Sequence, residues 1–391
     1  MENSPLHSLE GLSSEVTRLA EAPETSLLKK VLETQIVIKK RKKSHITFSQ
    51  PIITCDGRPV LFPRTINVIQ GQNGVHKSRV AEIFTAALLS DYRTTSNLLG
   101  FRKDSLFEPH VVYLDTERNL LDQFPAAIQS IQRLTGVNHE VDIDGFEFSS
   151  LIDVPRDQRF EALRQFLTYL RKNTDKEMVV VLDVLSDCIQ DFNSASDSLT
   201  LIDMMNEMIN HHNVTFIAII HENPGSQKAR GHLGTELTNK ASTVLQVSLM
   251  DSIDPKSDQL VKISYLKCRS SERHPDMLVK YSKEDRTLVL ADESEMQQAL
   301  TSRQVKAPVH EIKDSVRVHL NKLGAMKKVE LIELLSEAFA CSPNTIRERI
   351  QTLIDTQTPI VDKESHTTKT LIERKEGRIV WLELSTPLLP E

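Results

Sequence analysis

Short apolar runs alternate with amphipathic segments through the middle of the chain. Four runs are almost continuous in Val, Ile and Leu: TINVIQ (65–70), HVVYLD (110–115), MVVVLD (178–183) and VTFIAII (214–220). Such runs are typical of parallel strands that crossover helices bury on both faces. Helical periodicity fills intervals between them, at 78–90, 156–172 and 197–212. The pattern predicts an α/β fold with a mostly parallel sheet.

Further apolar runs follow at 242–248, 260–268 and 287–292. Two of these later runs are closer to strict alternation of apolar and polar residues, which indicates antiparallel strands at an edge of the sheet.

The two ends of the chain have different patterns. A Ser/Glu-rich start leads into a short helix predicted at 26–38 and then the basic cluster 39–43. After residue 310, helices are predicted at 310–323, 327–339 and 343–356, with strands at 370–374 and 378–384. We therefore divide the chain into an N-terminal extension (1–48), an α/β domain (49–292), a linker (293–309) and a small α+β domain (310–391).

The segment between the first predicted strand and its helix resembles a phosphate-binding loop. The pattern G-x-x-x-x-G-K-[ST] is met by GQNGVHKS except at one position, and the loop comprises Gly71, Gln72, Asn73, Gly74, Val75, His76, Lys77 and Ser78, with Arg79 following. In such loops backbone N–H groups surround the phosphates, the lysine contacts the β- and γ-phosphates, and the hydroxyl binds Mg²⁺. The interpretation without a ligand is a polar turn between a strand and a helix.

His76 stands where the pattern requires glycine. Glycine is usual there because the backbone passes close to the phosphates. A side chain that points away is compatible with an allowed φ, so we expect the imidazole to point to solvent and the loop to bind nucleotide.

Polar residues close the next three apolar runs. Glu117 follows HVVYLD, Asp183 ends MVVVLD, and His221 follows VTFIAII. Because ligands bind at the carboxyl ends of parallel strands, these side chains are expected to meet at one site. Glu117 is suited to orient and deprotonate an attacking water, Asp183 to hold Mg²⁺ largely through water, and His221 to sense the γ-phosphate. Each has a structural alternative: a capping turn, a generic buried strand, or a core histidine.

The ordered series resembles the RecA-type ATPase fold over roughly residues 50–290. It is most similar to RepA-type helicases of plasmids and mobile elements, with DnaB-type helicases more distant. The resemblance implies that Glu117 is the catalytic carboxylate and that Lys77 and His221 contribute to catalysis. It also implies ATP and Mg²⁺ as cofactors.

Two basic pairs gain a role from the same resemblance. Lys228 and Arg230 match a segment that faces the central channel or a neighbouring subunit. Lys267 and Arg269 match a K-x-R strand end that enters the neighbour's nucleotide site, with Arg269 as arginine finger. Such a finger implies a homo-oligomer, as a ring or filament. The alternatives are a solvated loop and an exposed strand end.

The C-terminal pattern of helix, tight turn, helix and two strands outlines a winged helix. Ser342 or Asn344 is expected to cap the second helix, with Pro343 in its first turn. A DNA-binding version would use Arg347, Arg349 and Lys375. Basic and acidic residues are nearly balanced here, so a protein-binding module is equally compatible.

Composition restricts the remaining possibilities. The net charge is −6, so contact with nucleic acid has to be local. The four cysteines include no C-x-x-C pair, so there is no zinc or disulfide framework. No run reaches the ~18 apolar residues of a membrane span, and no secretion signal is evident, so we expect a cytoplasmic protein.

These observations predict an ATP-hydrolysing nucleic-acid motor or loader, helicase-like, with single-stranded DNA in its channel. The alternative is an ATP-dependent regulator or assembly ATPase without unwinding activity, whose winged helix binds DNA or a partner. A further possibility is a scaffold that binds nucleotide without turnover.

Overall fold

The computed structural model describes residues 27–91, 98–250, 259–269, 271–296, 307–361, 367–377 and 379–386. Within them the central sheet has nine strands in the order β12-β11-β10-β9-β3-β8-β7-β5-β6. The strands are β3 (Ile66–Gly71), β5 (His110–Asp115), β6 (Phe146–Ser150), β7 (Met178–Asp183), β8 (Val214–His221), β9 (Thr243–Leu249), β10 (Leu260–Cys268), β11 (Met277–Ser282) and β12 (Thr287–Leu290).

From β6 to β9 neighbouring strands are parallel, and from β9 to β12 they are antiparallel. The predicted fold class, α/β with a mostly parallel sheet, is confirmed, and so is the antiparallel edge. Strands β7 and β8 are buried over almost their whole length, as their uninterrupted apolar sequences require.

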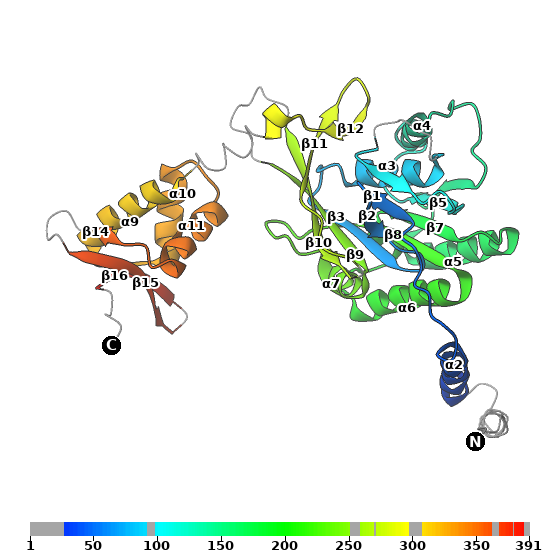
Figure 1. Ribbon diagram of the computed structural model, residues 1–391, viewed down its shortest axis with the longest axis horizontal. Coiled ribbons are helices and arrows are strands. Elements are labelled where there is room, and N and C mark those ends of the chain that lie inside the picture. Colours follow the sequence, from blue (N-terminus) through cyan, green and yellow to red (C-terminus); the bar gives the residue numbers. More distant parts are fainter. Residues whose placement is uncertain are drawn as a thin grey trace, which may run out of the picture.

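Helices cover both faces of this sheet (Figure 1). One face packs against α3 (Lys77–Leu89) and α4 (Gln123–Thr135), and the other against α5 (Arg156–Asn173), α6 (Ala195–His212) and α7 (Gly231–Lys240). Alternate residues of one strand enter different cores: Val179 and Val181 lie with α3 and α4, whereas Val180 lies with α5 and α6. The sequence pattern did not predict α4, α7, β6 or β11.

A small separate sheet, in the order β2-β1-β4, lies beside the first helix layer. It consists of β1 (Ile53–Cys55), β2 (Arg58–Leu61) and β4 (Phe101–Lys103), none of which was predicted. A short 3-10 helix, η1 (Leu185–Cys188), follows β7.

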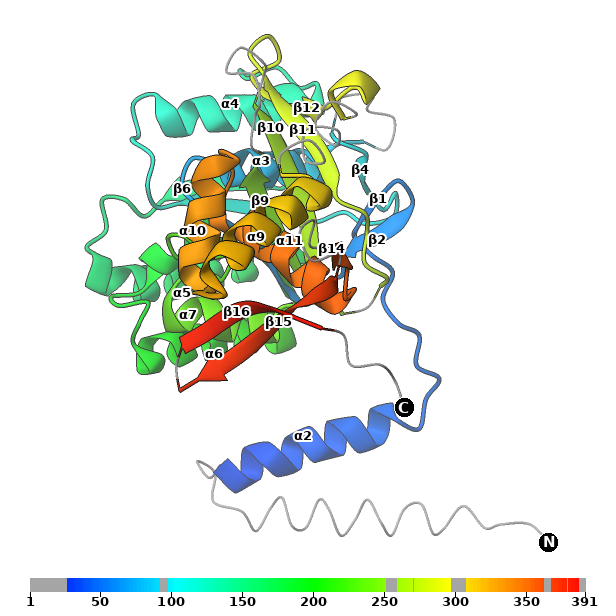
Figure 2. The same cartoon turned by 90° about the vertical axis from the view of Figure 1, so that its left-hand side faces the viewer.

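The N-terminal helix α2 (Leu27–Arg41) is longer than predicted, so the first residues of the basic cluster form its last turn (Figure 2). A basic last turn is favourable because it faces the negative end of the helix dipole. No residue of α2 is buried. The segment 1–26 of the predicted extension lies outside the described residues. Among the helices that the structure describes, none is long and apolar enough to cross a membrane.

The C-terminal unit has its own core, in which Val316, Leu331, Leu335, Ile346 and Leu382 are fully buried. Its elements are α9 (Val309–Leu323), β13 (Ala325–Lys327), α10 (Lys328–Ala338), α11 (Pro343–Asp355), β14 (Ile360–Val361), β15 (Thr368–Glu376) and β16 (Ile379–Ser385). The strands pair antiparallel in the order β13-β16-β15-β14.

The expected helices and both main strands of this unit are therefore present. Ser342 caps α11 by accepting a hydrogen bond from the Thr345 N–H at 3.2 Å, and Pro343 opens the helix. The winged-helix assignment and the domain boundaries stay predictions.

Candidate nucleotide site

The glycine loop connects β3 to α3 as predicted. Gly71 ends the strand at a close approach, because a Cβ there would lie 2.2 Å from the Val247 carbonyl oxygen. Gly74 has a φ of +77°, which favours glycine. No side chain caps α3. Its first-turn N–H groups, which have no partner within the helix, therefore suit an anion.

His76 has φ 69° and ψ 26°, inside the small left-handed region that non-glycine residues can occupy. Its ring does not point into open solvent as expected. It stacks on Tyr281 of β11, with ring centroids 5.4 Å apart and planes 6° apart. Burial lowers the pKa of His76, and the neighbouring Arg79 guanidinium lowers it further. The imidazole is thus held against an aromatic ring in surroundings that favour its neutral form.

Lys77 is almost fully buried at the start of α3, with 5% of its surface exposed. Its Nζ donates to the Gln72 carbonyl oxygen at 2.7 Å and lies 3.1 Å from Nδ1 of His221. Burial lowers the pKa of Lys77, while Asp183, Glu117 and Glu222 oppose that shift. Lys77 is therefore a buried cation whose charge three nearby acidic groups favour.

Ser78 and Asp183 lie together, as the sequence predicted. The Ser78 hydroxyl donates to Oδ1 of Asp183 at 3.1 Å. Both groups carry oxygen donors, the ligand type that Mg²⁺ prefers, so Ser78 and Asp183 would together hold the ion that accompanies the nucleotide. The described residues include no cluster of three or more His, Cys, Asp or Glu side chains suited to a metal. Further ligands would have to be phosphate oxygens and water.

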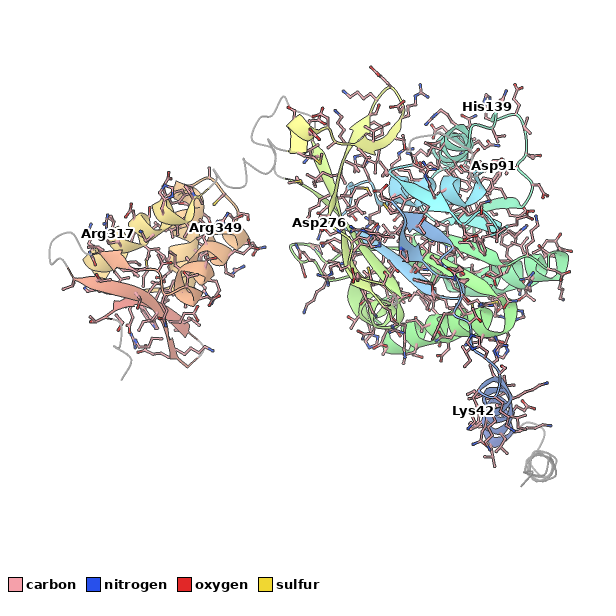
Figure 3. The ribbon with its side chains drawn as sticks, in the orientation of Figure 1. Lys42, Asp91, His139, Asp276, Arg317 and Arg349 are labelled. Atoms are coloured by element: carbon pink, nitrogen blue, oxygen red, sulfur yellow. The ribbon has the colours of Figure 1, made fainter. Side chains whose placement is uncertain are left out.

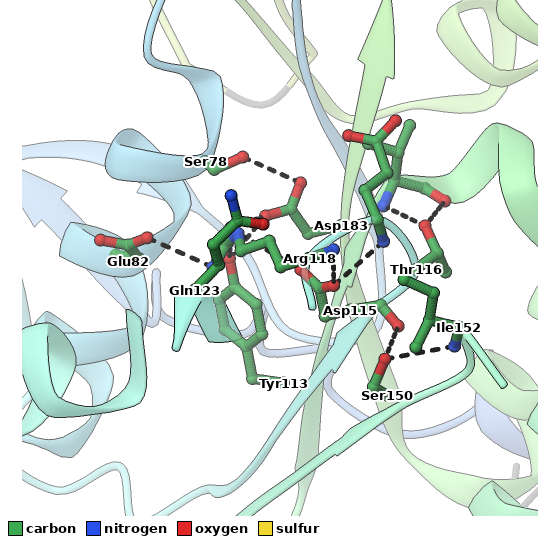
Figure 4. Close-up of polar contacts among 12 residues, drawn as sticks. Ser78, Glu82, Tyr113, Asp115, Thr116, Arg118, Gln123, Ser150, Ile152 and Asp183 are labelled. Atoms are coloured by element: carbon green, nitrogen blue, oxygen red, sulfur yellow. Dashed lines mark hydrogen bonds and ion pairs between the residues drawn. The ribbon is translucent and has the colours of Figure 1, made fainter. Parts of the chain in front are cut away.

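Asp183 is also held from its other side, by residues that the sequence analysis did not select (Figure 4). Oδ2 accepts a hydrogen bond from the Tyr113 hydroxyl at 2.8 Å, and it also forms a close ion pair with Arg118. Arg118 further pairs with Glu82 at 3.4 Å and Asp115 at 3.3 Å. A glutamate within the apolar face of α3 was the sequence signal for this network, because a buried carboxylate requires a partner.

Glu117 and His221 meet at the end of the sheet. Nε2 of His221 lies 3.4 Å from Oε1 of Glu117, whose side chain is 50% exposed. The hydrogen bond from His221 is the main cause that lowers the pKa of Glu117. Since the Lys77 ammonium can only donate, Nδ1 of His221 accepts and its Nε2 carries the proton toward Glu117. Polar contacts therefore link Lys77 to His221 and His221 to Glu117.

Parallel register explains this convergence. Asp115 at the end of β5 is the pairing partner of Asp183 at the end of β7, and Gly71 of β3 is the partner of His221 of β8. All four strand ends lie at the same edge of the sheet, where parallel α/β proteins bind ligands.

A second network of buried polar side chains lies next to the loop, and the sequence pattern did not predict it. Glu222, 5% exposed, accepts from the side-chain amides of Gln70 at 2.8 Å and Gln246 at 2.6 Å. Gln72 reaches across the same turn and donates to the Asn223 carbonyl at 2.7 Å. These bonds tie the loop after β3 to the turn after β8.

Lys267 and Arg269 lie at the opposite edge of the sheet from the phosphate loop. The backbone N–H of Arg269 donates to Ser242, whose own N–H donates to Ile66 at the start of β3. Gly71 is five residues further along that strand, roughly 16 Å away at about 3.3 Å per residue. Both side chains contact carbonyl oxygens at the end of α7. They cannot reach the loop of their own chain.

Lys228 and Arg230 lie in the turn between β8 and α7, next to the site but outside it. Both are exposed. The Arg230 guanidinium lies over the Phe192 ring, 4.7 Å from its centroid.

In the C-terminal unit Arg347 and Arg349 lie on α11, and Figure 3 labels Arg349 there. Arg347 is exposed and bonds to Asn344, and Lys375 is exposed near the end of β15. Arg374, beside it, pairs with Glu376 and Glu383. The basic residues of this unit are thus partly neutralised by their neighbours.

No protein-family model matches the sequence, and no curated protein matches it. Similar solved structures include the RadB recombinase, with 15% identity and a TM-score of 0.40 over 59% of this chain and 92% of RadB. Another is the flagellar accessory protein FlaH from Methanocaldococcus jannaschii, with 13% identity and a TM-score of 0.40 over 59% of this chain and 91% of FlaH.

Proposed function

We propose that this protein is a RecA-type ATPase that binds ATP with Mg²⁺ at the β3–α3 loop and hydrolyses it. The observation that carries the proposal is the convergence of Lys77, Ser78, Asp183, His221 and Glu117 at one sheet edge. Mg²⁺, when bound with the nucleotide, supplies charge neutralisation at the phosphates.

The chain's own residues divide the remaining work. Lys77 neutralises phosphate charge from a site where burial strengthens its electrostatic effect. Glu117 is kept ionised by His221 and is exposed enough to bind and orient a water. His221 joins Glu117 to Lys77, so a phosphate that draws Lys77 away from Nδ1 also changes the proton donor that Glu117 faces.

We further propose that the active form is a homo-oligomer, a ring or filament. Lys267 and Arg269 are too far from their own loop to act there, but they lie at an edge that can face a neighbour's site. In a helicase-like motor or loader, Lys228 and Arg230 would contact single-stranded DNA in the channel. Resemblance to RepA-type helicases supports this version, with a cytoplasmic replication or mobile-element system as its setting.

The second candidate is an ATP-dependent regulator or assembly ATPase without unwinding activity. The ion pairs of Arg374 with Glu376 and Glu383 favour it, because cations already paired contribute less to DNA binding. In that version the C-terminal unit binds a protein partner or a specific duplex.

The test is the ATPase rate with and without single-stranded DNA, for wild type and Lys77→Ala. The motor version predicts hydrolysis that DNA stimulates and that Lys77→Ala abolishes. Hydrolysis independent of single-stranded DNA would favour the regulator, and no hydrolysis in wild type would refute both.

A further inference from the structure

Arg118 is a largely enclosed cation in the proposed site, and none of the roles above uses it. Its side chain is 16% exposed, and its acidic neighbours Glu82, Asp115 and Asp183 are between 1% and 3% exposed. These partners come from three elements, α3, β5 and β7. Figure 4 shows the guanidinium between them. The planar guanidinium carries several N–H donors, so this one side chain faces all three carboxylates, as a hydrogen bond to Asp183 and as ion pairs to Glu82 and Asp115.

The two oxygens of Asp183 have different partners. Oδ1 faces the Ser78 hydroxyl, whereas Oδ2 receives both the Tyr113 hydroxyl and Arg118. Rotation of the carboxylate would break the bonds at Oδ2. Asp183 therefore presents one defined oxygen toward Ser78, the position proposed for the metal.

The Arg118 side chain also pairs with Asp115, the residue whose carboxylate closes the turn that carries Glu117. Oδ1 of Asp115 accepts the backbone N–H groups of Glu117 at 3.0 Å and Arg118 at 2.7 Å. Oδ2 of the same carboxylate faces Nε of Arg118 at 3.3 Å. One guanidinium thus links the carboxylate beside Ser78 to the turn that orients Glu117.

We propose that Arg118 is a positioning residue for Mg²⁺–ATP: it fixes the Asp183 carboxylate so that one oxygen faces the metal, and it couples that carboxylate to the Glu117 turn. The inference depends on the proposed ATPase function and goes beyond it, because it assigns metal positioning to a residue outside the metal's own ligands. Partners that orient a metal ligand typically contribute 10–100-fold in metal affinity or activity.

The competing explanation is that Arg118 only neutralises buried acids. A lysine would neutralise them too, but without the planar set of donors. Removing Arg118 alone also changes the local charge, which by itself would strengthen cation binding. A charge-balanced variant separates the two effects: Glu82→Gln/Arg118→Met removes one negative and one positive charge together and leaves Asp183 intact.

The experiment measures the affinity of a fluorescent ATP analogue in EDTA and in saturating Mg²⁺. The ratio of the two affinities reports the metal's contribution, and the full-length protein is used throughout. Variants are Arg118→Lys and Glu82→Gln/Arg118→Met, with Arg164→Met as matched control, because the Arg164–Glu161 pair is exposed on α5. Urea unfolding confirms that each variant is folded.

We expect the Mg²⁺ ratio to fall by roughly 10–100-fold in the charge-balanced variant and by less in Arg118→Lys, with the EDTA affinity changed by under about threefold. Arg164→Met keeps the wild-type ratio. Wild-type ratios in both folded Arg118 variants would overturn the proposal and leave the ATPase function standing. Wild-type protein that binds no analogue in either condition would overturn the proposed function, and this inference with it.

Discussion

Replacing His76 by glycine restores the usual phosphate-loop pattern, and the structure predicts that little changes. The left-handed conformation costs a non-glycine residue roughly 1–2 kcal/mol, which glycine relieves. Glycine loses the stacking on Tyr281, worth about 0.5–1.5 kcal/mol for an aromatic pair, and ordering it costs a further ~0.5–1 kcal/mol. These terms nearly cancel, so His76→Gly is expected to shift the free energy of unfolding by less than about 1.5 kcal/mol.

His76→Ala is the matched comparison, because it keeps the backbone cost and loses the ring. It should lower the free energy of unfolding by about 0.5–1.5 kcal/mol, and a double-mutant cycle with Tyr281→Ala should return a coupling of that size. Urea unfolding measures both.

ATP affinity should change by less than about threefold in His76→Gly, roughly 0.6 kcal/mol, since the imidazole is directed at Tyr281. A titration with a fluorescent ATP analogue gives this value. Binding more than ten times tighter in the glycine variant would refute the reasoning and mean that His76 weakens the site.

Three further predictions concern the interface, the buried charges and the C-terminal unit. Mixing Arg269→Ala with Lys77→Ala protein, each inactive alone, should restore hydrolysis at about a quarter of the interfaces, because an intact loop then meets an intact finger; no recovery would contradict action in trans. Burial raises the pKa of Asp115 to about 6, with Arg118 and Asp183 the charged groups facing it. The folded state therefore binds the proton more tightly, and this contribution to stability is lost as pH rises from about 4 to 6. Asparagine cannot titrate, so the free energy of unfolding of Asp115→Asn, measured with urea, should rise by up to ~3 kcal/mol relative to that of wild type as the pH increases from about 4 to 6. If the free energy of unfolding depends on pH equally in both proteins, this prediction is wrong. Arg347→Glu with Lys375→Glu should weaken duplex binding and flatten its salt dependence if the unit binds DNA, whereas unchanged binding in a fluorescence anisotropy titration would favour a protein partner.

Periodicity was sufficient for the central strands because parallel strands buried on both faces must be apolar throughout. β7 and β8 were predicted almost to the residue for this reason. The short strands β1, β2 and β4 have three or four residues each, too few to form a period, so tertiary pairing decides them. In α4 a proline at its third residue obscured a strongly amphipathic helix.

The candidate site was predictable where functional side chains lie at the ends of strands. Strand register alone brings Asp183 and His221 to the edge of the sheet that holds Gly71. Arg118 and Glu222 were not predictable in the same way. Their roles depend on which buried polar groups face one another in three dimensions, and a single sequence contains no signal for that pairing beyond the presence of a charge in an apolar segment.

The most direct test of the account compares ATP binding and single-turnover hydrolysis in wild type and Glu117→Gln. Glutamine keeps the shape of Glu117 and can still contact His221, but it cannot take up a proton from water. The account predicts ATP affinity within about threefold of wild type and hydrolysis slowed by roughly 10²–10⁴-fold. Wild-type hydrolysis in Glu117→Gln would contradict the assignment of Glu117 as the catalytic carboxylate, and the absence of ATP binding in wild type would contradict the nucleotide site itself.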